Sequence, residues 1–143
     1  NYLTKDGDLD KCFAHVHNYL DPDGLFIFDV NTPYKFENVY GNNQYIFEDE
    51  NSYGQTTYCG WQNEYDKDSK LCNFYLSVFT EEDDGSYSRC DETQTERCYS
   101  LDELKNHLER CGLEFIGCFG GYDFSEPKND CERWYIIARA KKR

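Results

Sequence analysis

Residues 24–31 read Gly-Leu-Phe-Ile-Phe-Asp-Val-Asn, and this run constrains the fold more than any other part of the chain. Its five apolar residues, interrupted by one acid and followed by Thr-Pro, predict a short strand buried on both faces. Such a strand belongs in the middle of a largely parallel α/β sheet. Ligands of these sheets bind outside the carboxyl ends of the strands. We therefore expect Asp29, Asn31 and Thr32 to point toward a pocket.

The size and charge of the chain limit its partners. Its 143 residues suit one domain. The net charge of −13 repels phosphate backbones and anionic lipid, which argues against nucleic acid or a membrane as partner. No apolar run approaches the roughly 20 residues that a membrane span needs, and no signal peptide is recognisable. We therefore expect a cytoplasmic location.

The chain contains eight cysteines but no Cys-x-x-Cys pair. We interpret them as reduced thiols that serve as small hydrophobic residues. A zinc site needs clustered ligands, and only three histidines accompany the cysteines. His15 and His17 are two residues apart on a predicted helix, so they face different directions. We predict no metal site.

Both ends of the chain read as an α/β framework. Apolar residues at helical spacing predict a helix over 8–20, with Asp6 or Asp8 as its N-cap. The turn 21–24 ends this helix, and we expect Gly24 to accept a positive φ there. Ser100 and Glu103 form a capping box at the start of a second helix. That helix runs over 100–111, and strands follow over 113–119 and 133–140.

The middle of the chain, 38–98, has a different character. It is rich in tyrosine, threonine and acids, and it reads as strands over 55–65, 71–80 and 86–98 joined by short turns. Consecutive strands with short turns must be antiparallel, so this part is a meander inserted into the framework. Its last strand, 88–97, is polar on both faces, as expected at a solvated surface or a wet cleft.

This inventory predicts an incomplete sheet. The strands 25–30 and 133–140 both require burial on two faces, yet only two helices are available to cover them. The chain also opens on Asn1-Tyr2-Leu3 as though at the end of a preceding strand. Either another chain covers the sheet, or about half of a larger domain lies outside this sequence. We favour the second interpretation.

Several motifs together carry a family resemblance. Asn1-Tyr2-Leu3, the helix, the turn Pro22-Asp23-Gly24 and the strand 25–31 resemble the C-terminal half of class I S-adenosylmethionine-dependent methyltransferases. The capped helix 100–111 and the last two strands resemble the family's final helix and terminal antiparallel strand pair. The likeness is greatest to bacterial small-molecule methyltransferases with an antiparallel β insertion. It implies a Rossmann-like core over 1–37 and 99–143, with 38–98 as an insertion on the substrate side.

One part of the family pattern is absent. Neither the acidic-Gly-x-Gly-x-Gly loop nor the acid that ends the family's second strand occurs in this sequence. The resemblance thus implies S-adenosyl-L-methionine as cofactor for a parent protein whose N-terminal half holds it. We expect these 143 residues to be inactive alone.

The resemblance also suggests positions for the site. Asn1 and Tyr2 match the segment beside the transferring methyl group, which makes them candidate cofactor-binding residues or ordinary loop residues. Asn31, Thr32 and Tyr34 follow the strand, where they could bind substrate or form a turn.

Further substrate-binding candidates lie in the insertion and the last loop. Trp61, with Tyr58 and Tyr75, could wall a pocket or simply pack within the sheet. Arg97 could hold a substrate carboxylate, although a surface ion pair is the simpler interpretation. Tyr122, next to Asp123, completes the candidates. No catalytic residue can be assigned.

Three functions remain open at this level. The first is a methyltransferase part acting on a small-molecule acceptor. The second is a non-enzymatic, acidic, β-rich binding module, and the third is another α/β enzyme with a different cofactor. The methyl acceptor and the oligomeric state cannot be read from the sequence.

Overall fold

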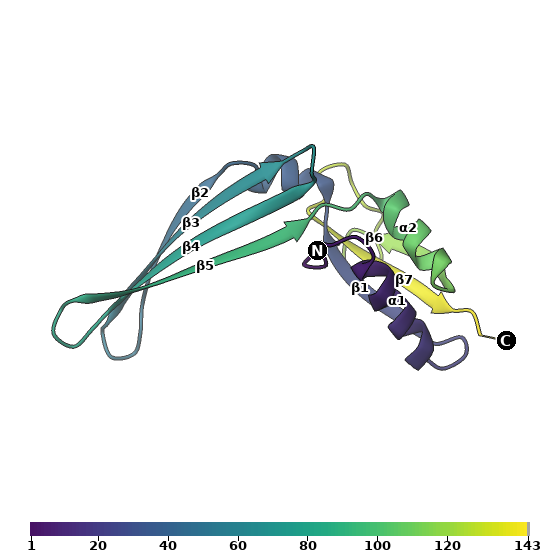
Figure 1. Cartoon of the computed structure of the whole chain (residues 1–143), viewed down its shortest axis with the longest axis horizontal. Coiled ribbons are helices and arrows are strands. Elements are labelled where there is room, and N and C mark those ends of the chain that lie inside the picture. The colour runs from purple at the N-terminus through teal and green to yellow at the C-terminus, as the bar shows by residue number, and fades with distance from the viewer. Residues whose placement is uncertain (143) are drawn as a thin grey trace.

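The computed structural model describes residues 1–142, which form two antiparallel sheets with helices on one of them. Figure 1 shows a compact part that carries both α-helices and a long β arm that projects from it. The elements in chain order are α1 (Asp8–Tyr19), β1 (Leu25–Asn31), the π-helix η1 (Lys35–Tyr40), β2 (Gln44–Glu50), β3 (Thr56–Asp66), β4 (Leu71–Glu81), β5 (Tyr87–Arg97), α2 (Leu101–Arg110), β6 (Leu113–Phe119) and β7 (Arg133–Ala140).

The three-stranded sheet has the order β1-β7-β6, and both of its strand pairs are antiparallel. The last two strands therefore form the antiparallel pair that the sequence predicts. The prediction of a largely parallel sheet is wrong for residues 1–142, because β1 pairs with β7 alone and leaves its other edge open. Parallel neighbours of β1 could come only from residues outside this chain.

Both α-helices pack against the same face of this sheet. Phe13 of α1 and Leu104 and Leu108 of α2 are buried against side chains that alternate along β7. The capping box of α2 is present as predicted: Glu103 N donates to Ser100 Oγ at 3.2 Å, and Ser100 N donates to Glu103 Oε2 at 2.8 Å. The buried β7 residues are Ile136, Ala138 and Ala140.

Two local predictions near α1 are wrong. Gly7 is the N-cap, with a φ of 82°, and no side chain caps the helix, so neither Asp6 nor Asp8 has that role. In the turn after α1, Asp23 rather than Gly24 adopts the positive φ, at 60°. Gly24 is needed for space, because a Cβ there would lie 2.8 Å from the backbone oxygen of Asp21.

The second face of the three-stranded sheet is uncovered within the described residues. Leu25 is 52% exposed and Ile27 is 63% exposed. The prediction that this strand is buried on both faces is therefore wrong for the described residues. Ile27 lies opposite Ile137 of β7, and both belong to this uncovered face. Phe26 and Phe28 point the other way and contact Phe13 in the core. The apolar run is therefore covered on one side only.

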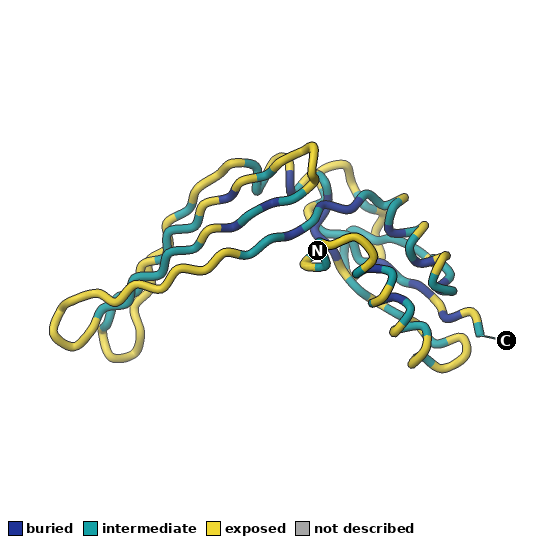
Figure 2. Tube along the Cα trace, in the orientation of Figure 1, coloured by how far each residue is buried: buried dark blue, intermediate teal, exposed yellow. Residues whose placement is uncertain are grey.

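The arm is the predicted meander, with the strand order β2-β3-β4-β5. The three predicted strands correspond to β3, β4 and β5, whereas β2 and η1 were not predicted. A second apolar cluster, Phe36, Cys72, Phe74 and Cys98, fixes the base of the arm against η1. Figure 2 shows that burial fades from this base toward the hairpin tips.

All eight cysteines are unpaired, and Cys72 and Cys98 are buried. Cys72 and Cys98 thus act as the small hydrophobic residues that the sequence predicts, whereas Cys90 is exposed. Neither α-helix of residues 1–142 is long and apolar enough to cross a bilayer.

Candidate functional site

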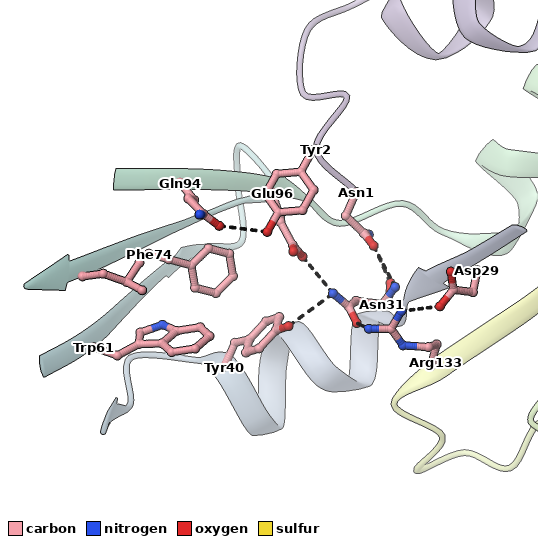
Figure 3. A pocket seen from close by; sticks show the side chains of 11 residues that line it. Asn1, Tyr2, Asp29, Asn31, Tyr40, Trp61, Phe74, Gln94, Glu96 and Arg133 are labelled. Atoms are coloured by element: carbon pink, nitrogen blue, oxygen red, sulfur yellow. Dashed lines mark hydrogen bonds and ion pairs between the residues drawn. The ribbon is translucent and has the colours of Figure 1, made fainter. Parts of the chain in front are cut away.

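A cavity of about 420 Å³ lies between the end of β1 and the base of the β arm. Residues from both sheets line it, so it exists only because the insertion folds back on the framework (Figure 3). One side is polar and charged, and the other is aromatic. The lining residues are Asn1, Tyr2, Asp29, Asn31, Tyr40, Trp61, Phe74, Leu76, Gln94, Glu96 and Arg133.

Asn31 joins the two sheets at the floor of this cavity. It ends β1, and its Nδ2 donates to Glu96 Oε2 of β5 at 2.9 Å and to the Tyr40 hydroxyl at 3.2 Å. Its Oδ1 accepts a hydrogen bond of 3.1 Å from Arg133. Asn31 and Glu96 are 5% and 6% exposed. Because the amide oxygen faces a cation and the amide nitrogen faces a carboxylate, the orientation of Asn31 is fixed.

The charges of the cavity are unequally paired. Arg133 forms an ion pair with Asp29, and this contact raises the pKa of the Arg133 guanidinium. Glu96 has no Lys, Arg or His within ion-pair distance in the described residues. Among the side chains that line the cavity, two carboxylates therefore face one guanidinium, and the amino group of Asn1 lies near both carboxylates. A buried carboxylate without a Lys, Arg or His as ion-pair partner favours the binding of a cation.

The first residues of the chain close one side of the cavity. The Asn1 side chain accepts from Asn31 N at 2.7 Å and donates to Arg97 O at 3.0 Å. Tyr2 lies next to it, and its hydroxyl donates to Gln94 at 2.9 Å. Burial and the negative charge of Glu96 raise the pKa of Tyr2. These contacts bring the start of the chain beside the last strand of the arm.

Aromatic side chains form the opposite wall. The ring centroids of Tyr40 and Phe74 are 4.9 Å apart, and those of Trp61 and Phe74 are 5.9 Å apart, both in edge-to-face arrangements. Trp61 Nε1 donates to Asn63, which fixes the indole. Burial, followed by the charge of Glu96, raises the pKa of Tyr40 to about 12. Tyr40 thus remains a neutral phenol at neutral pH.

The cavity contains four of the eight residues that the sequence suggested for cofactor and substrate. They are Asn1, Tyr2, Asn31 and Trp61, and their roles stay predictions. Asp29, which the strand pattern also directed to a pocket, lies there too.

Thr32 and Tyr34 lie outside this cavity. Thr32 is buried; its Oγ1 donates to Cys131 O at 2.6 Å and accepts from Lys35 N at 3.2 Å, so it secures the start of η1. Tyr34 lines a separate depression with Pro127.

Arg97 and Tyr122 also lie elsewhere. Arg97 Nη1 contacts Asp6 Oδ1 at 3.0 Å, and its guanidinium lies 5.2 Å from the Tyr99 ring centroid. This is the surface ion pair that the sequence offered as the simpler interpretation. Tyr122 is 86% exposed, and its ring packs against that of Tyr135 in a tilted arrangement.

The remaining aromatic candidates of the insertion do not line the cavity either. The hydroxyl of Tyr75 donates to Glu64 at 2.9 Å, and Tyr58 packs on Tyr87. Asp123 is exposed and accepts from Ser125 N.

Sequence reasoning missed Glu96, Arg133 and Tyr40. Glu96 is one of several acids in a strand that is polar on both faces, and no local signal separates it from the others. Arg133 opens a strand, and Tyr40 ends the unpredicted π-helix. The rarity of π-helices outside functional sites would have made Tyr40 a candidate had η1 been recognised.

The residues present fit a methyl donor only in part. No group of His, Cys, Asp or Glu in residues 1–142 could hold a metal ion. The carboxylates of Asp29 and Glu96 in the lining suit a cationic sulfonium. The glycine loop that binds such a donor in the resembling family is not in this sequence.

Comparisons with known proteins show which part of a methyltransferase this chain resembles. No protein-family model matches the chain. A relative from Bacillus subtilis (strain 168), named "Putative methyltransferase YqeM", is 27% identical over 143 residues. That match covers 99% of this chain and 55% of the relative. The chain thus spans about half the length of the curated relatives it matches.

In the solved structures too, nearly all of this chain aligns with about half of the other chain. A S-adenosylmethionine-dependent methyltransferase from Clostridium acetobutylicum ATCC 824 superposes with a TM-score of 0.84 at 28% identity, covering 99% of this chain and 55% of that one. The sugar N-methyltransferase KedS8 from Streptoalloteichus sp ATCC 53650 superposes with a TM-score of 0.76 at 12% identity, covering 99% and 52%. The second likeness shows the fold alone.

The fold and the comparisons define the class of this chain. It is an α/β segment that aligns with the C-terminal half of the methyltransferase fold. More particularly, it matches the C-terminal part, about 55%, of S-adenosylmethionine-dependent methyltransferases, several of which act on small molecules.

Proposed function

We propose that this chain is the acceptor-side part of a S-adenosylmethionine-dependent methyltransferase that methylates a small molecule. The N-terminal half of the same protein would bind most of the donor. The observation that carries the proposal is the cavity at the end of β1, built from both sheets, in a chain that matches such enzymes along 99% of its length.

The uncovered sheet face supports a missing half. Leu25, Ile27 and Ile137 form an apolar surface beside the open edge of β1. Exposed apolar side chains on a sheet with a free edge favour a further packing layer and further strands. An N-terminal half would supply both.

The cavity suits a small acceptor. Its volume of about 420 Å³ lies within the range of about 300–1,000 Å³ that is usual for small-molecule sites. The net charge of −13 disfavours nucleic acid as acceptor. The free thiols agree with a reducing, cytoplasmic location.

In this reaction, the residues of this chain would position the acceptor relative to the methyl group of the donor. S-adenosylmethionine, when bound, supplies an electrophilic methyl group for an in-line displacement. Rate enhancement in such a reaction comes largely from alignment of the acceptor with the methyl group. Asn1 and Tyr2 would face the donor, while Asn31 and Trp61 would hold the acceptor. The hydrogen bonds of Asn31 to both sheets make it a rigid floor for that purpose.

Calorimetric titration of the intact protein tests the proposal. S-adenosylhomocysteine and S-adenosylmethionine are expected to bind with one site per protein. Tyr2→Ala is expected to weaken this binding several-fold, whereas Tyr53→Ala, at an 88% exposed residue between β2 and β3, should leave it unchanged. Absence of binding to either nucleoside would refute the proposed function.

A further inference from the structure

The carboxylate of Glu96 is buried at the edge of the cavity and forms no ion pair with a Lys, Arg or His of the described residues. Its Oε2 accepts from Asn31 at 2.9 Å, and the Tyr2 hydroxyl lies within hydrogen-bonding reach of the carboxylate. The side chain is 6% exposed, yet it borders the cavity. The nearest guanidinium in the cavity, that of Arg133, is bound to Asp29 and to the oxygen of Asn31. Asn31 therefore lies between Arg133 and Glu96 and keeps the Arg133 guanidinium away from the Glu96 carboxylate.

Aromatic faces surround the same space. Figure 3 shows Tyr2 on one side of Glu96 and Tyr40, Phe74 and Trp61 on the other, with the carboxylate between them. Aromatic rings attract cations through the negative charge of their faces, and the attraction is larger where water is excluded. A carboxylate beside several rings is the arrangement that recognises organic cations.

The cavity is also unfavourable to anions. Burial and the charge of Glu96 both oppose ionisation of Tyr2 and Tyr40. An anionic acceptor would meet the same charge. A neutral acceptor would cover the carboxylate of Glu96 without supplying a counter-charge.

We propose that Glu96, with the rings of Tyr40, Trp61 and Phe74, forms a binding site for an organic cation. The cation is either the ammonium of an amine acceptor or the sulfonium of the donor, and both share the charge and the apolar substituents that this site fits. The inference rests on the proposed function. It adds a specificity-determining residue to it, because Glu96 selects a positively charged group.

The test uses the intact protein saturated with S-adenosylhomocysteine, whose sulfur is neutral. Benzylammonium chloride is titrated calorimetrically, with benzyl alcohol as the uncharged counterpart. Benzylammonium is expected to bind at least tenfold more tightly, and to shift the indole N–H signal of Trp61, assigned from Trp61→Phe. This comparison needs only the wild-type protein, so it stands even where a variant does not fold.

Two variants then locate the charge. Glu96→Gln keeps the shape and an acceptor for Asn31 but removes the charge, and it is expected to weaken benzylammonium about tenfold. Asp91→Asn is the matched control: it removes a carboxylate from the other face of β5, where Asp91 contacts Ser77 and Arg89. It should leave the affinity unchanged.

The outcomes separate the two cations and the two proposals. Binding of benzylammonium that depends on Glu96 assigns the site to an amine acceptor. Failure of benzylammonium to bind, together with Glu96→Gln weakening S-adenosylmethionine but not S-adenosylhomocysteine, assigns it to the sulfonium. The cation site is refuted if benzyl alcohol binds as tightly as benzylammonium. It is also refuted if Glu96→Gln changes neither the preference for benzylammonium over benzyl alcohol nor that for S-adenosylmethionine over S-adenosylhomocysteine. In both cases, nucleoside binding still supports the methyltransferase. If neither nucleoside binds, the proposed function itself fails.

Discussion

The amide of Asn31 donates a 2.9 Å hydrogen bond to the carboxylate of Glu96, and this contact links the end of β1 to the end of β5 across 65 residues of sequence. It is the buried polar connection between the framework and the β arm. The same amide also contacts Tyr40 and Arg133. Asn31 therefore connects lining residues from both sheets and from η1.

Replacement of Asn31 by alanine is expected to lower the free energy of unfolding of the intact protein by about 2 kcal/mol. The change leaves the Glu96 carboxylate buried without its donor, and loss of a hydrogen bond to a charged group costs about 1.5–3 kcal/mol. Urea denaturation measures the loss. Asn18→Ala, at an exposed position of α1, is the control and should change stability by less than about 0.5 kcal/mol. Equal effects of the two variants would show that Asn31 is not a structural link.

Ser100→Ala is expected to destabilise the protein by about 1 kcal/mol, because it removes the N-cap acceptor of α2. Ser100→Asp retains an acceptor for Glu103 N and should restore most of the stability. Thermal unfolding monitored by circular dichroism compares the three proteins. A Ser100→Asp protein as unstable as Ser100→Ala would contradict the capping role.

Tyr40 makes stability depend on pH in the alkaline range. Its pKa is raised from an ordinary value of 10.0 to about 12, so between these values the folded protein holds a proton that the unfolded chain has lost. Stability from this group is complete below pH 10 and falls as the pH rises toward 12. The stability of wild type relative to Tyr40→Phe should therefore decrease over this window, as measured by urea denaturation at several pH values. A constant difference would mean that Tyr40 ionises normally.

Gly24→Ala is expected to destabilise the turn between α1 and β1. An added Cβ would lie 2.8 Å from Asp21 O, an atom of the backbone that cannot rotate away. Gly60→Ala is the matched control, because its Cβ would meet nothing closer than 3.9 Å and its φ is not positive. We expect a loss of about 1–3 kcal/mol for the first and no loss for the second, as for overpacked positions. If both variants are as stable as wild type, the close approach at Gly24 carries no cost.

The sequence predicted the elements whose signals are local. The capping box of Ser100 and Glu103 marks α2, and alternation of apolar residues marks β4, since both patterns lie within a few residues. The run at Leu25 predicted a strand correctly, but not its neighbours. Its second face and second edge are uncovered within residues 1–142, and we propose that an N-terminal half covers them.

The site was less predictable, because it depends on register. Side chains alternate between the two faces of a strand, so Glu96 faces the cavity while Arg97, one residue on, contacts Asp6 on the opposite side. A strand with polar residues on both faces gives no indication of which face is enclosed. Arg133 and Tyr40 come from an unmarked strand start and from a π-helix, and only the tertiary fold brings them to Asn31.

A crystal structure of the intact protein with S-adenosylhomocysteine tests the central claim most directly. We predict that the N-terminal half covers Leu25 and Ile27, and that the sulfur lies next to Asn1 and Tyr2 at this cavity. A sulfur bound away from this cavity, for example at the depression beside Tyr34 and Pro127, would contradict it, as would an intact protein in which Leu25 and Ile27 remain exposed.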